Sequence, residues 1–581
     1  MKWVALFSLI VMVSLTITAQ NNIVITKSGR NDLSLPLKKV DGKSAVSTQA
    51  IPMSHYTESV EQTEQGTRSP TEIVASFDGL GFGFEGPQGT ATHRNPSDNS
   101  LAVGPDHIIQ TVNSKMAIFT KKGNKYGNTG VVLYGPVNTN NVFKGFGGPC
   151  EQMNNGDAVV RYDQLAGRWL IVMPIFRRLP PRDYEPEPRK HGEPAKESMV
   201  GNPGQPGQAE LLYQPPKPTP EELAIADSLR RTVRRERPRN EGGSYCMCYA
   251  ISTGPDPFGP YYRYEFVRPL FPDYPRPAVW PDGYYVPTST GDHVIQKHAC
   301  VAEREKMLEG KPAQEICFII DSVGFLNNAD LDGYQLPHEG DPNIMMATGG
   351  AQLKNIFGDD GIYYWKFSVD WEEPSKSKLD GPHKIDVAEY SYLGNGQLMR
   401  TVPQPGTDEK LDSQGDKIMS RLVYRRIGDR ESIVAVHSVN TSAGGGGVRW
   451  YEFRIDDKRD VKLYQQGTYA PDNNYRWMGS PAMDKYGNIG IGYSFGGASH
   501  FPGQRFTGRL TDDPPGMLTL REAILVEGEA SQTNTMRWMD YAQTAVDPDD
   551  DCTIWYVGDY LKAGAENYST RIGAFRIKNV E

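Results

Sequence analysis

Two copies of a short motif near the C-terminus combine side chains that bind and orient polar ligands. The first copy reads RWMGS at residues 476–480 and the second reads RWMDY at residues 537–541. Each copy offers a guanidinium for an anion and an indole ring for stacking, and the second adds a carboxylate and a phenol. Each copy continues into an alternating apolar run, an acidic turn and a second aromatic-rich run, at residues 481–493 and 542–556. The motif therefore marks a repeated structural unit.

Aspartates also precede two earlier apolar runs of the same kind. Asp98 comes shortly before LAV at residues 101–103, and Asp157 comes directly before AVV at residues 158–160. If such runs are strands that start at one end of a shared axis, the residues before them gather there, although they are far apart in sequence. The predicted ligand-binding residues are Asp98, Asp157, Arg476, Trp477, Arg537, Trp538, Asp540 and Tyr541.

Carboxylates, guanidinium groups and aromatic rings on one concave surface suit a sugar or uronic acid. They supply hydrogen bonds for hydroxyl groups, charge for a carboxylate and stacking for the ring. A carboxylate pair roughly 5 to 9 Å apart would also permit glycoside hydrolysis, but the sequence does not identify catalytic residues. In the competing interpretation the aspartates bond backbone amides at strand starts, and both tryptophans pack between neighbouring sheets.

The elements that would position these residues are repeated β-sheets. The repeat at roughly 60-residue spacing, with 60 Gly, 43 Pro, 30 Tyr and 9 Trp, is typical of short strands joined by tight turns. We predict an all-β fold: a single β-propeller at residues 73–581, with about seven blades of four-stranded antiparallel sheets. Aspartates in the predicted hairpin turns would bond backbone amides two residues further on.

The N-terminus is typical of a secretory signal at residues 1–19, and the polar residues 20–72 predict a flexible leader. We expect a secreted, periplasmic or cell-surface protein without a membrane span. Six cysteines permit disulfides in such a compartment. Cys300 and Cys317 could bridge a hairpin or loop, whereas the pairing of Cys150, Cys246, Cys248 and Cys552 stays open.

Residues 177–242 are rich in proline and charge and interrupt the second repeat. We interpret them as an insertion that contains a short helix, because TPEE at residues 219–222 is a helix-start signal followed by apolar residues at helical spacing.

The net charge of −9, without long acidic runs, argues against nucleic acid as a partner. No metal site or cofactor is predicted. Calcium at the acidic run DPDDD, residues 547–551, is the alternative to a solvated turn, although the spacing of a calcium loop is missing.

The chain resembles exported bacterial β-propeller proteins of largely unknown activity. The resemblance rests on YRWMGS at 475–480, GYS at 492–494, RFTGR at 505–509 and DCTIWY at 551–556. It implies a propeller fold and export, and in outline it extends to sialidase-like propellers, although their Asp-box pattern is absent. No shared activity follows from it.

Together these patterns predict an exported propeller that binds an extracellular glycan at the mouth of its central axis. If it is an enzyme, the expected class is a glycoside hydrolase or polysaccharide lyase. The alternative is a non-enzymatic adhesion or protein-interaction scaffold whose partner is a surface protein.

Overall fold

The computed structural model describes residues 23–34, 60–93, 95–176, 245–268, 270–289, 296–321, 323–350, 356–396, 400–565 and 567–577. Over these residues the protein is all-β, and its helices are single turns: η3 (Thr139–Phe143), α1 (Gly148–Gln152), α3 (Arg304–Leu308), η4 (Pro374–Lys376) and η5 (Leu393–Asn395). The predicted signal segment and the insertion at 177–242, with its predicted helix, lie outside the described residues.

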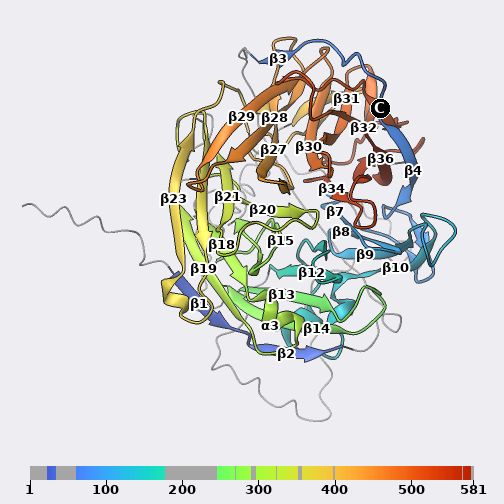
Figure 1. Cartoon of the computed structure of the whole chain (residues 1–581). Coiled ribbons are helices and arrows are strands. Elements are labelled where there is room, and N and C mark those ends of the chain that lie inside the picture. Colours follow the sequence, from blue (N-terminus) through green and yellow to red (C-terminus); the bar gives the residue numbers. More distant parts are fainter. Residues whose placement is uncertain are drawn as a thin grey trace, which may run out of the picture. The chain divides into compact units, whose positions relative to one another are not determined.

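The strands form successive antiparallel meanders (Figure 1). The first contains β7 (Asn99–Val103), β8 (His107–Val112), β9 (Lys115–Thr120) and β10 (Val132–Asn138). The next contains β11 (Val159–Asp163), β12 (Arg168–Ile175), β13 (Tyr245–Ser252) and β14 (Tyr261–Arg268). It is followed by β15 (Ala278–Trp280), β16 (Gly283–Tyr285), β17 (Thr288–Ser289), β18 (Gln296–Ala302) and β19 (Gln314–Asp321).

The later meanders are joined edge to edge into one longer sheet. It contains β20 (Asn327–Asp332), β21 (Asn343–Thr348), β22 (Ile362–Ser368) and β23 (Lys378–Ile385). It continues through β26 (Leu422–Ile427), β27 (Arg430–Asn440), β28 (Gly446–Ile455) and β29 (Val461–Tyr469). It ends with β30 (Tyr475–Met483), β31 (Ile489–Gly497), β32 (His500–Arg509) and β33 (Ala523–Val526). β20 pairs in parallel with β26, and β28 pairs with β30 at a single position, so these joins link neighbouring meanders.

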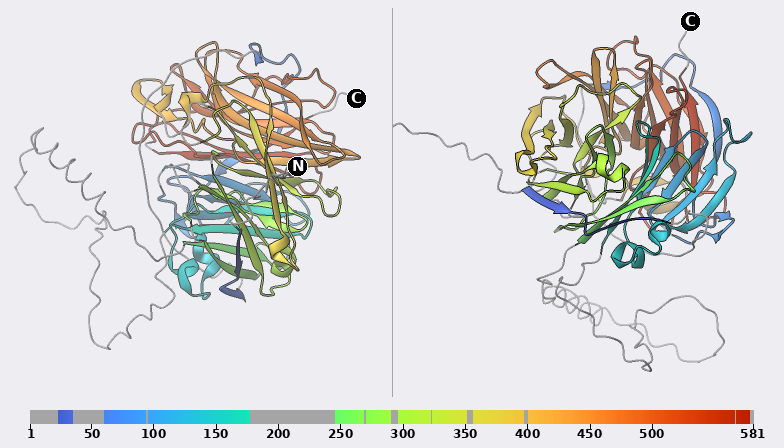
Figure 2. Two further views of the ribbon diagram at one scale, coloured as in Figure 1. Left: turned by 90° about the vertical axis from the view of Figure 1, so that its left-hand side faces the viewer. Right: turned by 60° about the horizontal axis from the view of Figure 1, so that its bottom comes forward.

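The first strands of the meanders form a closed ring. β7 contacts β11, and contacts continue through β15, β20, β26 and β30 to β34 (Gln543–Val546), which contacts β7 again. We call these seven strands the inner strands. The further views show the sheets arranged around this centre (Figure 2). The arrangement is therefore propeller-like, as the repeats predicted.

The last sheet of the ring is completed by a strand from the N-terminal part of the chain. β35 (Ile554–Tyr560) and β36 (Ser569–Arg576) follow β34, and the N-terminal strand β4 (Glu72–Gly79) pairs antiparallel with β36. This pairing closes the ring with a strand from the opposite end of the chain, which protects an edge that would otherwise stay open.

Part of the segment predicted to be a flexible leader is instead built into the sheets. β1 (Ile23–Lys27) pairs with β19, and β2 (Arg30–Leu33) pairs with β14. β3 (Glu61–Gln62) pairs in parallel with β29. The prediction of a flexible leader rested on the polar composition of this segment. Edge strands, however, are held by backbone hydrogen bonds and need little apolar surface. Small hairpins at β5 (Glu85–Gly86) and β6 (Gly89–Thr90), and at β24 (Arg400–Gln404) and β25 (Thr407–Asp412), complete the strands.

Aromatic rings and glycines contribute to the packing between neighbouring sheets. The rings of Phe506 and Phe575 stack with centroids 4.0 Å apart and come from β32 and β36. Gly492 lies against Tyr556, so a Cβ at this position would approach the ring to 2.5 Å. Burying one such large side chain contributes about 1.5–3 kcal/mol, and the glycine is what allows the tyrosine to enter.

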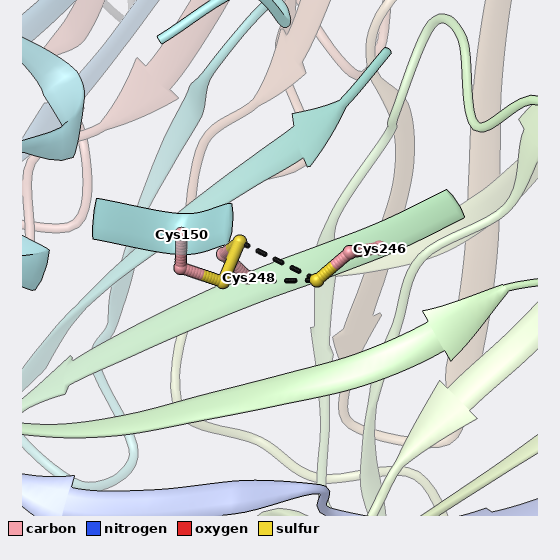
Figure 3. Close-up of side chains that lie close together, drawn as sticks. All are labelled: Cys150, Cys246 and Cys248. Carbon is pink, nitrogen blue, oxygen red and sulfur yellow. Dashed lines mark hydrogen bonds between the residues drawn. A yellow bond between two sulfur atoms is a disulfide. The ribbon is translucent and has the colours of Figure 1, made fainter. Parts of the chain in front are cut away.

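Two disulfides cross-link strands inside the sheets. Cys300–Cys317 joins the paired strands β18 and β19, in agreement with the predicted hairpin bridge. Cys150 of α1 bonds Cys248 of β13, and the thiol of Cys246 lies 3.7 Å from the sulfur of Cys150 (Figure 3). Cys246 and Cys248 point to the same side of β13, as predicted for residues two apart in a strand.

Several predicted turn aspartates cap hairpins. Oδ1 of Asp163 accepts a hydrogen bond from the amide of Ala166, and Oδ1 of Asp484 accepts from the amides of Tyr486 and Asn488. Among the described residues, none of the helices has the length and apolar character needed to cross a bilayer.

Candidate functional site

Five of the eight predicted residues meet at the end of the ring where the inner strands begin, which we call the N-terminal mouth. Asp98 precedes β7, Asp157 precedes β11, and Asp540 and Tyr541 precede β34. The amide of Asp98 donates to the carbonyl of Met539 at 2.6 Å, which ties two strand starts together. Arg537 reaches the same place, since its Nη2 lies 2.6 Å from Oδ2 of Asp540.

Asn113 links the first two aspartates. Its Nδ2 donates to Oδ2 of Asp98 and to Oδ1 of Asp157, at 2.5 Å each, so the two oxygens are no more than twice that distance apart. Burial, and then the charges of Asp157 and Asp540, raise the pKa of Asp98 well above its ordinary value. Burial, and then the charges of Asp273 and Asp540, do the same to the pKa of Asp157. Such a pair is most stable when it retains a proton.

The third aspartate is held from two sides. Oδ2 of Asp540 binds Arg537, and Oδ1 accepts from the amide of Gln414. Nearby, Asp412 is fully buried, and burial raises its pKa to about 6. We call Asp98, Asp157 and Asp540, with Asn113, Gln414 and Arg537, the aspartate cluster.

Left-handed backbone is concentrated at this mouth. Among the described residues, nine non-glycine residues have a positive φ, and six of them belong to this mouth: Asp98, Met539 and Asp540 come just before inner strands, and Asn113, Tyr274 and Gln414 donate hydrogen bonds to the aspartates. This conformation costs non-glycine residues free energy and tends to persist at functional sites, where the surrounding structure imposes it. The strained backbone conformations and the aspartate cluster therefore lie at the same end of the ring.

Three cations surround one ring beside the aspartate cluster, and we call Arg276, Lys297 and Lys417 the basic face. The guanidinium of Arg276 and the ammonium groups of both lysines lie 3.7–5.8 Å from the ring centroid of Phe325. All three side chains are buried, and Lys417 contacts the carboxylate of Asp416 at 3.2 Å. Burial lowers the pKa of Lys297 to about 8; the carboxylates of Asp416 and Asp273 oppose this shift, and the charges of Arg276 and Lys417 add to it. An anion would relieve their repulsion.

Arg276 has an unused hydrogen-bonding edge. Its Nη1 donates to the carbonyl of Leu326 at 3.0 Å, and its plane lies 4.0 Å from the ring centroid of Tyr274. Nε and Nη2, which form the side-on edge of the guanidinium, are buried without an acceptor. This edge is the one that binds a carboxylate with two parallel hydrogen bonds. The hydroxyl of Tyr274 in turn donates to the carbonyl of Asp540 at 2.7 Å, which connects the basic face to the aspartate cluster.

The structure does not bring the other predicted residues to the mouth as ligand groups. Arg476 is fully buried and forms ion pairs with Asp472 at 2.9 Å and Glu522 at 2.8 Å. Trp477 and Trp538 are buried in the core, with ring centroids 6.2 Å apart. Nε1 of Trp538 donates to Oγ of Ser494 at 3.0 Å.

The residue after the methionine differs between the two motif copies. Met478 and Met539 share the left-handed conformation, with φ of 51° and 48°, but the backbones diverge at the next residue, where Asp540 has a φ of 86° and Gly479 continues strand β30. In the second copy Asp540 follows and captures Arg537, whereas in the first copy Gly479 follows and has no side chain. Arg476 therefore binds carboxylates from elsewhere.

The acidic run at residues 547–551 is neutralised by cations of the chain itself. Lys121 binds Asp547 and Asp549, Arg576 binds Asp550, and Arg425 binds Asp551.

Sequence reasoning did not find Tyr274, Arg276, Lys297, Gln414 and Lys417. For Arg276 a signal was present in the run YPRPAVW at residues 274–280. Arg276 stands shortly before the Ala-Val step of this run, much as Asp157 stands directly before its own Ala-Val step. Lys297 lies in β18, and its place beside Phe325 depends on folding alone.

Comparisons with known proteins add little to this geometry. The sequence matches no family model and no curated protein. Among solved structures, a protein of unknown function from Dyadobacter fermentans DSM 18053 aligns with a TM-score of 0.31 and 7% identity, covering 87% of this chain and 100% of that one. A structure described as NanB plus Optactamide aligns with a TM-score of 0.30 and 7% identity, covering 88% of this chain and 71% of that one. Likenesses this distant carry no argument about function.

Proposed function

We propose that this protein is an exported, seven-bladed β-propeller that binds an acidic extracellular glycan at the N-terminal mouth. The order of inner strands supports the blade number, and the N-terminal sequence pattern with two disulfides supports export. The aspartate cluster would bind sugar hydroxyls, and the basic face would bind the sugar carboxylate. Tyr274 and Tyr541, whose ring centroids lie 4.9 Å apart, connect the two groups.

The observation that carries the proposal is the side-on edge of Arg276. A buried guanidinium without an acceptor on two nitrogens is costly, and a carboxylate satisfies both nitrogens at once. Two further buried cations lie around the same Phe325 ring: Asp416 contacts Lys417, and the charges of Asp416 and Asp273 act on Lys297. A uronic acid residue supplies the carboxylate together with hydroxyl groups for Asp98, Asp157 and Asp540.

Cleavage is a second candidate function, favoured by the shared Asn113 contact. A carboxyl pair whose pKa is raised and which retains a proton can donate it to a glycosidic oxygen and take one back from water. The spacing of Asp98 and Asp157 is at or below the roughly 5 Å of retaining glycosidases, so Asp540 would be needed as the more distant carboxylate.

The test is binding to a glycan array that contains uronic acids, followed by calorimetry and product analysis with the strongest oligosaccharide. Arg276→Gln and Asp540→Asn should each weaken binding by about 10- to 100-fold, because each removes a charged hydrogen-bonding group. Asp408→Asn, on an exposed position of β25, is the matched control and should bind as the wild type does.

Product analysis separates binding from cleavage. If the protein is an enzyme, Asp98→Asn should lower turnover by about 10²- to 10⁴-fold while the oligosaccharide still binds. Unchanged affinity in Arg276→Gln and Asp540→Asn would refute the site. Binding of surface proteins in place of any glycan would support the scaffold function.

A further inference from the structure

Three cysteine sulfurs gather in the second meander, and we call Cys150, Cys246 and Cys248 the cysteine cluster (Figure 3). Cys150 belongs to α1, whereas Cys246 and Cys248 belong to β13. All three side chains are fully buried. Cys150 and Cys248 form a disulfide and Cys246 is a free thiol. The cluster therefore contains one sulfur more than its disulfide needs.

The free thiol lies close to both sulfurs of the disulfide. Sγ of Cys246 is 3.7 Å from Sγ of Cys150 and 3.8 Å from Sγ of Cys248. Reacting atoms held roughly 3–3.5 Å apart are close to the geometry of attack, and these sulfurs need to approach only slightly. A disulfide exchanges its partner when a thiolate attacks one of its sulfurs, so the folded chain already places the reactants together.

The exchange needs no external reagent. Sγ of the Cys246 thiolate would form a bond to Sγ of Cys150, and the bond between Cys150 and Cys248 would break. Sγ of Cys248 leaves with the electron pair and takes up the proton that Cys246 lost. One disulfide and one thiol are present before and after, so nothing is oxidised or reduced overall. Full burial of the cluster is thus compatible with this reaction.

The surroundings of Cys246 favour its neutral thiol. Burial raises the pKa of Cys246 well above its ordinary value; the charges of Glu265 on β14 and Glu315 on β19 add to this shift, and that of Arg268 on β14 opposes it. Because the thiolate is the attacking species, the exchange should be slow at neutral pH and faster at higher pH. Slow exchange lets each disulfide isomer persist long enough to be measured.

The cysteine cluster is connected to the N-terminal mouth through α1. This helix ends at Gln152, shortly before Asp157 of the aspartate cluster. In the loop between them, Nδ2 of Asn154 donates to the carbonyl of Ser114 at 2.9 Å. Ser114 directly follows Asn113, whose amide group binds both Asp98 and Asp157. A movement of α1 would therefore reach the aspartates through two routes, the loop itself and Ser114.

The two possible disulfides attach α1 to different points of β13. Cys246 lies opposite Ile175 at the end of β12. That end is on the side of the N-terminal mouth, because β12 runs antiparallel to β11, whose start follows Asp157. Along the strand, Cys246 is about 7 Å nearer the mouth than Cys248, since a strand rises about 3.4 Å per residue. A bond to Cys246 would thus draw α1 toward the aspartate cluster.

We propose that Cys150 exchanges its disulfide partner between Cys248 and Cys246, and that the exchange changes the aspartate cluster and with it ligand affinity at the N-terminal mouth. The effect on affinity rests on the glycan binding proposed above, whereas the exchange itself does not. The chain would in this way carry two covalent isomers of one fold.

The first test maps the disulfide in the full-length chain. After incubation at pH 7 or pH 9, the chain is unfolded in acid, which stops the exchange, and free thiols are blocked with N-ethylmaleimide. Tryptic peptide 240–263, linked to peptide 145–161, then carries the label on Cys246 or on Cys248. Both labelled forms should appear, and the second should accumulate faster at pH 9. Label on Cys246 alone after long incubation at pH 9 would overturn the proposal. Cys300–Cys317 is the internal control and should remain one species.

The second test compares two locked variants, Cys246→Ala and Cys248→Ala, each of which leaves Cys150 a single partner. Their affinities for the acidic oligosaccharide that binds the wild type should differ about fivefold or more, as is typical of coupled sites. Cys552→Ala removes the free thiol outside the cluster and should bind as the wild type does. Equal affinities of the locked variants would overturn the link to the mouth.

Melting temperatures decide the link if no oligosaccharide binds any of these chains, an outcome that would refute the proposed function alone. Neither locked variant has a free thiol in the cluster, so the two differ only in where α1 is attached. If the attachment changes the aspartate cluster, the difference between their melting temperatures should vary between pH 4 and pH 8. A constant difference would overturn the link, and the disulfide map would still decide the exchange.

Discussion

Asp98 and Asp157 accept hydrogen bonds from the same nitrogen, Nδ2 of Asn113, although they precede the first strands of two different sheets. An amide group cannot neutralise two carboxylates, so the pair depends on a retained proton or on the nearby Arg537. This relationship makes the N-terminal mouth sensitive to pH.

Asp98→Asn should stabilise the protein progressively as the pH rises. The folded-state pKa of Asp98 lies above its unfolded value, so its contribution to stability is present below the unfolded pKa, near 3.9, and is lost as the pH rises through the folded pKa. Asparagine does not titrate, so the variant does not lose this contribution as the pH rises. The melting temperature of the variant minus that of the wild type should therefore grow between pH 4 and pH 8. A difference that is constant across this range, beyond that of Asp408→Asn, would show that Asp98 does not hold the proton.

Arg476→Met should destabilise the fold without changing glycan affinity. It removes the 2.8 Å ion pair of the Glu522 carboxylate, which is 2% exposed, and leaves Arg505, 4.0 Å away, as its remaining cation. We therefore expect a loss of about 1–3 kcal/mol. Denaturant unfolding should show this loss, and the double variant Arg476→Met/Glu522→Gln should recover most of it. Lower glycan affinity at normal stability would instead assign Arg476 to ligand binding.

Trp477→Ala should behave as a core substitution. The side chain is fully buried against Trp538, and removing a buried aromatic residue costs about 3–5 kcal/mol. Trp538→Phe should cost about 0.5–1.5 kcal/mol from the lost bond to Ser494. Both losses are measurable by chemical denaturation. If either variant folds with normal stability but no longer binds glycan, the tryptophan rings take part in ligand binding and this prediction is wrong.

Cys248→Ala should leave a disulfide in place, because Cys246 can replace it. The sulfur of Cys246 lies 3.7 Å from that of Cys150 and on the same face of β13 as Cys248. Peptide mapping without reductant should detect a Cys150–Cys246 bond. The variant lacking both Cys246 and Cys248 should lose about 4–5 kcal/mol, as expected for a cross-link between residues 98 apart. A free Cys150 in the single variant would contradict this exchange.

The backbone pattern of the repeats was readable in the sequence because strand alternation and turn chemistry are local. The RWM copies, the aspartate turns and the Ala-Val steps all predicted short strands; the first RWM copy lies in β30, and the second leads into β34 without being a strand itself. The same reasoning brought Asp98, Asp157 and Asp540 to one end, since the starts of radially arranged strands share an axis.

What the sequence by itself determined was therefore the all-β repeat and the place of its strand starts. Tertiary structure alone decided that Arg537 joins Asp540 while Arg476 joins Glu522, and that Lys297, Lys417 and Arg276 surround Phe325. It also decided that β1 and β2 complete sheets made by distant segments. The physical reason is range: turns and alternation depend on neighbours in the chain, whereas ion pairs and edge pairing depend on segments that only folding brings together.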